Sequence, residues 1–172
     1  ISEFEKSLAV MGNEVEELAR GMFPSGYLID KRSEGAQELT QKLIAEQAPV
    51  IFQAVFATDK YLAAAYVLKW NDSVKKYDIY EIKMSSTESA DEEDGGEEEE
   101  DKKPKRVNKK RELQYEYDLA FQTNVIEACG VQLHGKYMVR LKRAYVRDGE
   151  LDFTPNKLFM IKDKTEAREL VK

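Results

Sequence analysis

Hydrophobic positions recur with helical spacing in three stretches of the chain, and this periodicity predicts three helices. The stretches are residues 4–19, residues 33–47 and residues 113–129. Pro49 follows the second stretch and Gly130 follows the third, and both are residue types that end helices.

Runs rich in β-branched and aromatic residues separate the second helix from the third and follow the third helix, and these runs predict strands. The predicted strands are at residues 50–57, 61–70, 76–84, 137–146 and 158–161. Short polar turns join the first three, which favours an antiparallel meander. Residues 27–30 read as a strand or a loop, and residues 164–172 as a terminal helix. This order predicts an α/β or mixed α+β fold around one central sheet.

Length and composition narrow the class of protein further. A chain of 172 residues predicts a single domain with a core that needs no metal or disulfide. The single cysteine, Cys129, excludes a disulfide framework within the chain and a site built from several cysteines. Since no apolar run is long enough to span a bilayer, we expect a soluble, cytoplasmic protein with no membrane partner. The chain begins at Ile1 without a methionine, so we expect a fragment whose partners include other domains of a parent protein.

Charge is distributed unevenly along the chain. Residues 88–101 contain ten acidic side chains and no basic one, whereas residues 102–111 contain seven basic side chains and no acidic one. Residues 86–111 therefore predict a disordered charged insertion, because such a composition cannot bury enough apolar surface to order itself. An alternative is that the basic half contacts a nucleic-acid backbone. The net charge of −6 does not decide between these alternatives, because it says little about a local groove.

The strand at Tyr77–Lys83 carries the strongest chemical pattern. Because side chains alternate across a strand, Glu81 and Lys83 share one face, and Asp78 lies on the other. A carboxylate beside an ammonium can hold a divalent cation and stabilise a developing anion. The alternative is an ordinary surface pair on a half-exposed strand.

The element order, with E-x-K on the third strand and a glutamine on the next helix, resembles the PD-(D/E)XK nuclease superfamily. The most specific matching segments are YDIYEIKMSS and the later DLAFQ. The chain is most similar to the RecB-like nucleases, which include a bacterial family of unknown function related to CRISPR-associated exonucleases. The resemblance implies a restriction-endonuclease-like fold, with a central mixed sheet flanked by helices, and a metal-dependent DNA nuclease of exonuclease type.

The resemblance also implies roles for individual residues. Glu81 would bind Mg²⁺ or Mn²⁺ together with the carbonyl oxygen of Ile82, and Glu16 on the first helix is a further possible ligand. Lys83 would orient or polarise the attacking water, and Gln122 would lie beside the site. Magnesium prefers carboxylate and water oxygens and lowers the pKa of bound water, which suits phosphodiester hydrolysis.

The chain departs from the family pattern at three positions. Tyr66 occupies the place of the motif aspartate, Gln53 occupies that of a glutamate, and Glu16 stands where some relatives have a histidine. Neutral phenol and amide groups are poor ligands for a hard cation, so we expect weakened metal binding and impaired catalysis. The alternative function is an inactive nuclease-like domain that binds nucleic acid or serves as a scaffold within a larger protein.

Basic residues late in the chain are the candidate contacts to DNA. Arg140, Arg143 and Arg147 cluster on the late strand and the turn after it. A solvated face is the simpler interpretation, and phosphate contact is the functional one. The only histidine, His134, lies beside Gly135 in an expected turn, where a catalytic role is not favoured.

Overall fold

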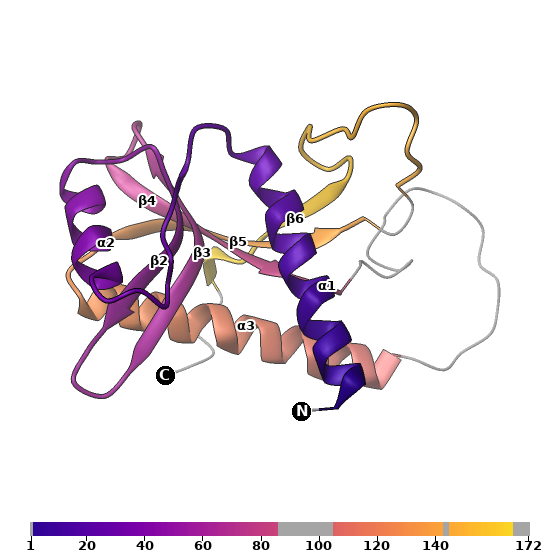
Figure 1. Cartoon of the computed structure of the whole chain (residues 1–172), viewed down its shortest axis with the longest axis horizontal. Coiled ribbons are helices and arrows are strands. Elements are labelled where there is room, and N and C mark those ends of the chain that lie inside the picture. Colours follow the sequence, from indigo (N-terminus) through magenta and orange to yellow (C-terminus); the bar gives the residue numbers. More distant parts are fainter. Residues whose placement is uncertain (1, 86–104, 143–144, 167–172) are drawn as a thin grey trace.

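The computed structural model of the chain describes residues 2–85, 105–142 and 145–166 (Figure 1). These residues form three α-helices, one 3-10 turn and a six-stranded sheet in which the strands lie in their sequence order. The helices are α1 (Glu3–Ala19), η1 (Arg20–Met22), α2 (Ala36–Ala45) and α3 (Lys105–Ala128). The strands are β1 (Tyr27–Leu28), β2 (Val50–Ala57), β3 (Leu62–Asn71), β4 (Lys76–Lys83), β5 (Leu133–Leu141) and β6 (Phe159–Asp163).

The three helices and the single central sheet confirm the predicted mixed α/β class. The sheet itself contains both parallel and antiparallel strand pairs. The strands β2, β3 and β4 form the predicted antiparallel meander. The outer pairs differ, since β1 runs parallel to β2, β5 runs parallel to β4, and β6 runs antiparallel to β5. A parallel pair needs a long crossover, and α3 lies in the connection between β4 and β5.

Two hydrophobic cores lie on opposite faces of the sheet. On one face, α2 and α3 pack against the meander through residues such as Leu43, Leu119 and Ile126. On the other face, the end of α1 and the segment that follows it pack against the sheet through Ala19 and Phe23. We call these the α3-side core and the α1-side core. Each strand of the meander therefore has side chains buried on both faces.

Two elements, α3 and β5, have boundaries that differ clearly from the sequence-based expectations. The helix α3 begins at Lys105, so residues 105–111, expected in a disordered insertion, are helical. Lysine, arginine and glutamate are good helix formers, and composition alone does not separate a charged helix from a charged loop. The strand β5 spans Leu133–Leu141, so it begins before the expected residue 137 and ends before the expected residue 146. Residues 86–104 and most of the expected terminal helix, residues 167–172, lie outside the described residues.

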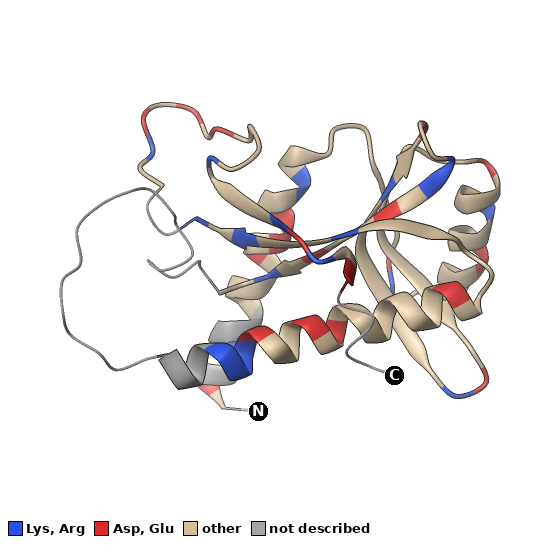
Figure 2. Cartoon of the chain, turned by 180° about the vertical axis from the view of Figure 1, so that it is seen from behind, with Lys and Arg blue, Asp and Glu red and all other residues tan. Residues whose placement is uncertain are grey.

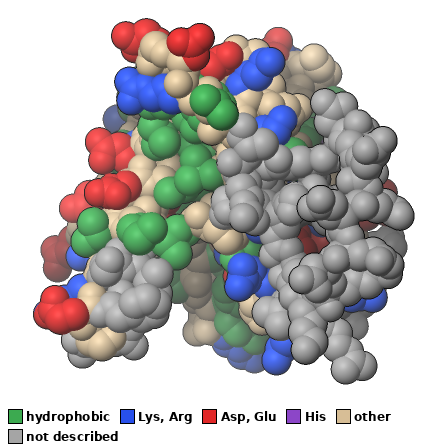
Figure 3. Space-filling view, turned by 90° about the vertical axis from the view of Figure 1, so that its right-hand side faces the viewer, with side chains coloured by type: hydrophobic (Ala, Val, Ile, Leu, Met, Phe, Trp, Pro, Cys, Tyr) green, Lys and Arg blue, Asp and Glu red, His purple; other side chains and the backbone are tan. Residues whose placement is uncertain are grey.

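Charge and apolar surface are both segregated on the exterior. In α3, basic residues at 109–111 precede a series of acidic residues along the helix (Figure 2). On the face seen in Figure 3, hydrophobic side chains form a band with acidic side chains along its left side. None of the helices formed by the described residues has the length and apolar character needed to span a bilayer.

Candidate functional site

The candidate site lies where the pairing of β3 with β4 ends. The two strands pair from Asn71 and Lys76 as far as Val67 and Tyr80, and the recorded pairing stops before Tyr66 and Glu81. The side chains of Tyr66 and Glu81, just beyond this end, line one cavity.

An unusual backbone conformation lies opposite Tyr66 on the neighbouring strand. Gln53 has φ of 58°, between the paired residues Phe52 and Ala54 of β2. The left-handed region is uncommon for residues other than glycine, so it interrupts the alternation of the strand. Phe52 accordingly belongs to the α1-side core and Ala54 to the α3-side core. The Gln53 side chain is buried and donates from Nε2 to the Glu16 carboxylate on α1, at 2.7 Å.

The E-x-K pair and α3 form a connected polar network. Lys83 Nζ lies 2.8 Å from Glu81 Oε1 and 2.9 Å from Asp118 Oδ2. Gln122 Nε2 donates to the other oxygen, Glu81 Oε2, at 2.8 Å. The expected proximity of Gln122 to Glu81 is therefore confirmed. Asp118 and Gln122 are four positions apart, so both project from neighbouring turns of the same helix face.

A second layer of contacts holds Lys83 from the side of α3. Its Nζ lies 4.9 Å from the centre of the Tyr115 ring, and the Tyr115 hydroxyl lies 3.0 Å from Ser85 Oγ. The guanidinium of Arg140 lies near the same ring, 5.8 Å from its centre. Tyr115 thus contacts the candidate site, the end of β4 and the strand β5.

Burial dominates the electrostatics of the site. Glu81 is 2% exposed, and this burial raises the pKa of its carboxyl despite the opposing effect of Lys83. For Lys83, burial lowers the pKa, but the Glu81 and Asp118 charges and hydrogen bonds outweigh it and the net shift is upward. The pKa of Tyr66 is also raised, by burial first and then by the negative charges of Glu16 and Glu81. Tyr66 is therefore a neutral phenol at physiological pH.

The network borders a cavity of about 290 Å³. Its walls include Gln53, Tyr66, Glu81 and Gln122, and Lys31 lies at the same cavity. A second groove of about 510 Å³ shares Lys31 and Gln53 with it and is lined by residues of α1 and the 28–32 segment. The side chain oxygens of Gln53 and Gln122 are buried without a hydrogen-bond partner among the described residues.

The donor set at this site does not fit a divalent cation. Both Glu81 oxygens are already bound, to Lys83 and to Gln122, and Glu16 accepts a hydrogen bond from Gln53. Tyr66 contributes a neutral oxygen, whereas Mg²⁺ and Mn²⁺ are held largely by anionic oxygens. The described residues contain no group of three or more His, Cys, Asp or Glu side chains that could hold a metal ion.

Ile82, the other residue implied as a metal ligand, lies within the paired part of β4. Its register partner on β5 is Val139, and its side chain belongs to the α1-side core. The structure therefore gives Ile82 a clear packing role beside the network.

The three arginines proposed as DNA contacts have different environments. The side chain of Arg140 is 3% exposed, is paired with Glu112 and donates to the Ser85 carbonyl oxygen. It therefore joins β5 to α3 and to the end of β4, so the interpretation of Arg140 as part of a solvated face is wrong, and its contact to phosphate stays a prediction. Arg147 is exposed and donates from Nε to the Gly149 carbonyl oxygen, whereas Arg143 lies outside the described residues.

Asp78 and His134 form a separate cluster away from the network. Asp78 Oδ1 accepts a hydrogen bond from the Gly135 amide at 2.6 Å and lies 3.1 Å from His134 Nδ1. The register of β4 against β5 shifts at this point, and the Asp78 carboxylate satisfies the backbone there. Where β3 pairs with β4, Trp70 packs edge-on against the buried Tyr77, with ring centres 5.1 Å apart.

Sequence reasoning missed part of the network. Asp118 and Tyr115 were assigned no chemical role from the sequence. Both precede Gln122 at helical offsets, so projecting α3 onto the strand from Gln122 could have found them. The left-handed conformation of Gln53 has no comparable signal, because glutamine is not a residue type that favours it.

Comparison of the chain with protein-family models, with curated proteins and with solved structures finds no match.

Proposed function

We propose that this chain is a nuclease-like domain that binds nucleic acid without hydrolysing it. The observation that carries the proposal is the pairing of Lys83 with Glu81 and Asp118, at 2.8 and 2.9 Å. A resident ammonium neutralises the carboxylates that a metal-dependent nuclease would offer to a cation. The fold we propose for the chain is correspondingly that of the PD-(D/E)XK superfamily, with Tyr66 in place of the motif aspartate.

Nucleic acid is the proposed ligand because the cavity continues into a groove with exposed cations. Lys31 lies at both the cavity and the groove, and Arg20 and Arg32 line the groove. The acidic side chains Glu16, Glu17 and Asp30 line the groove as well, so the three basic side chains are matched by three acidic ones and phosphate contact is confined to the basic side chains. Such a surface supports modest, salt-dependent binding to phosphates.

The first test of this proposal is a metal titration of the parent chain and of the Tyr66→Asp variant. The Tyr66→Asn variant is the control, because asparagine has the size of aspartate without its charge. We expect Mn²⁺ to give calorimetric heat of binding only with Tyr66→Asp, because only that variant adds a carboxylate beside Glu81. Digestion of labelled linear DNA in Mg²⁺ or Mn²⁺ should follow the same order. Adding Glu81→Ala to Tyr66→Asp should abolish both gains.

Each arm of this test has a contrary outcome. Cleavage by the parent chain, absent from the Glu81→Ala variant, would show an active nuclease and overturn the proposal. Absence of metal binding by Tyr66→Asp would show that position 66 is not at a latent cation site.

Binding itself is measured by the anisotropy of a labelled oligonucleotide as the salt concentration is raised. We expect affinity to fall steeply with salt, because each neutralised phosphate releases counterions. Lys31→Gln should weaken binding and reduce the salt slope. A parent chain that binds no oligonucleotide even at low ionic strength would instead favour the scaffold function.

A further inference from the structure

We propose that Tyr61 and Phe121 form a stacking platform for the bases of an unpaired nucleic-acid strand, next to the candidate site. This inference rests on the proposed function and names the form of nucleic acid that the site takes. Both rings are exposed, at 56% for Tyr61 and 42% for Phe121. The two rings contact each other, so they form one contiguous exposed apolar patch rather than two isolated surface residues.

The two rings are held in a defined geometry. Their centres lie 5.7 Å apart and their planes are inclined at 89°. Two hydrogen bonds to Thr58 fix the turn before Tyr61. The Tyr61 amide donates to Thr58 Oγ1 at 3.0 Å, and the Thr58 amide donates to the Tyr61 carbonyl oxygen at 2.8 Å. Phe121 projects from α3. Because both backbones are fixed, the rings need little ordering when a base stacks on them.

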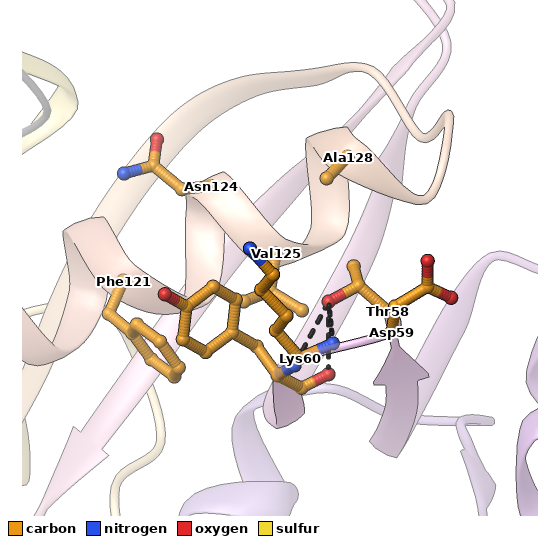
Figure 4. Close-up of a pocket in the computed structure, with 8 residues that line it drawn as sticks. Thr58, Asp59, Lys60, Phe121, Asn124, Val125 and Ala128 are labelled. Atoms are coloured by element: carbon orange, nitrogen blue, oxygen red, sulfur yellow. Dashed lines mark hydrogen bonds between the residues drawn. The ribbon is translucent and has the colours of Figure 1, made fainter.

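A pocket beside the rings has room and chemistry for a base. It has a volume of about 540 Å³, within the range of about 300–1,000 Å³ typical of small-molecule sites. Figure 4 shows residues that line this pocket: Phe121, Asn124, Val125 and Ala128 come from α3, and Thr58, Asp59 and Lys60 come from the hairpin turn. Lys60 and Asn124 add hydrogen-bonding groups around the apolar walls.

The platform is continuous with the candidate site. Phe121 lines both this pocket and the 290 Å³ cavity that contains Tyr66, Glu81 and Gln122. Leu62, which follows Tyr61 and is exposed, also lines the cavity. A strand lying in the candidate site can therefore extend directly over the aromatic rings.

The surrounding charges and the ring faces together favour an unpaired strand. Base–aromatic stacking requires bases whose faces are free, and within a duplex those faces are covered by neighbouring bases. Lys31 and Lys60 flank the continuous surface and can contact the backbone phosphates. The acidic residues Asp59, Glu81 and Asp118 also line it, so contacts to phosphates are confined to the two lysines and contacts to bases to the aromatic rings.

The inference is tested with two fluorescein-labelled oligonucleotides that carry the same number of phosphates, oligo-dT and a blunt hairpin duplex. The proteins compared are the full chain, Phe121→Ala, Tyr61→Ala and the ring-preserving control Phe121→Tyr. We expect the full chain to bind oligo-dT more tightly than the duplex. Each alanine variant should bind oligo-dT about fivefold or more weakly, which corresponds to ~1 kcal/mol, the lower end of the stacking energy per base. Phe121→Tyr should bind like the full chain.

A second readout reports stacking directly. An oligonucleotide with one 2-aminopurine should lose emission when the full chain binds, and this quenching should be absent with Phe121→Ala and present with Phe121→Tyr. Equal affinities for the two oligonucleotides, with no loss in either alanine variant and no quenching, would overturn the platform while leaving the proposed function standing. Failure to bind either oligonucleotide would overturn the proposed function and the platform with it. Circular dichroism of both alanine variants controls for folding, which exposed positions should not disturb.

Discussion

Glu81 is the residue on which the candidate site is centred, and its burial has a thermodynamic consequence. A carboxyl group whose pKa is raised on folding binds its proton more tightly in the folded state than in the unfolded state. Its contribution to stability is then fully present below the ordinary glutamate pKa and is lost as the pH rises through the raised value. Above the raised pKa, the buried charge of Glu81 makes folding less favourable than the protonated form does.

The prediction at this scale concerns Glu81→Gln, which removes the titration and keeps the shape. Relative to the parent chain, the variant should gain stability as the pH rises from 4 to 7, by about 1.4 kcal/mol for each unit by which the Glu81 pKa is raised. The measurement is the free energy of urea unfolding of both proteins at each pH. A constant difference between the two proteins across this range would contradict the upward shift.

At the residue scale, the sequence predicted positions better than partners. Alternation along the strand placed Glu81 and Lys83 on one face, and Asp78 on the other, as the structure has them. Arg140 was misplaced because its neighbours in sequence are basic and alternation assigned it a face without saying what covers that face. The covering residue, Glu112, comes from a helix that strand periodicity cannot position.

At the scale of elements, one threonine joins α2 to β2. Thr40 is fully buried. Its hydroxyl donates a hydrogen bond to the Ala36 carbonyl oxygen at 2.8 Å and accepts one from the Val55 amide at 2.9 Å. Val55 lies two positions beyond Gln53, where the strand has left its regular alternation. The hydroxyl therefore satisfies a backbone group close to the irregular part of the strand.

We predict that Thr40→Val destabilises the fold by about 1–3 kcal/mol, because the buried Val55 amide loses its side-chain partner. Thr40→Ser keeps the hydroxyl and should lose only about 1 kcal/mol, from the missing methyl group. Urea unfolding of the three proteins measures both effects. The explanation would be wrong if the serine variant were as unstable as the valine variant.

The antiparallel meander was predictable from sequence, and the position of β5 was less so. Short turns dictate that β2, β3 and β4 pair with their neighbours in the chain. The strand β5 pairs with β4 across a long connection, and no local signal fixes the register of such a pair. The register of β4 against β5 shifts near Asp78, and the alternation of residues 137–146 could not reveal this shift. The shift lies in the part of β5 that precedes the expected start of the strand.

At the scale of the whole molecule, Arg140 and Glu112 connect the sheet to its longest helix. The guanidinium is buried, contacts Glu112 of α3 and also donates to the Ser85 carbonyl at the end of β4. Removing one anion from a buried cation weakens the compensation of its charge and is destabilising. This contact is therefore a point at which a single substitution affects several elements together.

We predict that Glu112→Gln lowers the free energy of unfolding by about 1.5–3 kcal/mol, the range for hydrogen bonds to charged groups. The exposed Glu17→Gln on α1 serves as the charge-matched control and should change it little. Replacing both partners, as Arg140→Met with Glu112→Leu, should recover most of the loss, because no buried charge remains. Equal destabilisation by the single and the double variants would show that packing, not charge, is the cause.

The parallel pairing of β4 with β5 also bears on the order in which the chain assembles. Tyr77 pairs with Leu133, so forming this contact encloses residues 78–132 in a loop. The entropic cost of closing a loop grows with the logarithm of its length. The turns of the meander enclose only a few residues each. The β2–β3–β4 unit can therefore form early, and β5 together with α3 joins it late. Glu81 and Lys83 are then in place on one strand face before Asp118 and Gln122 arrive to close the network.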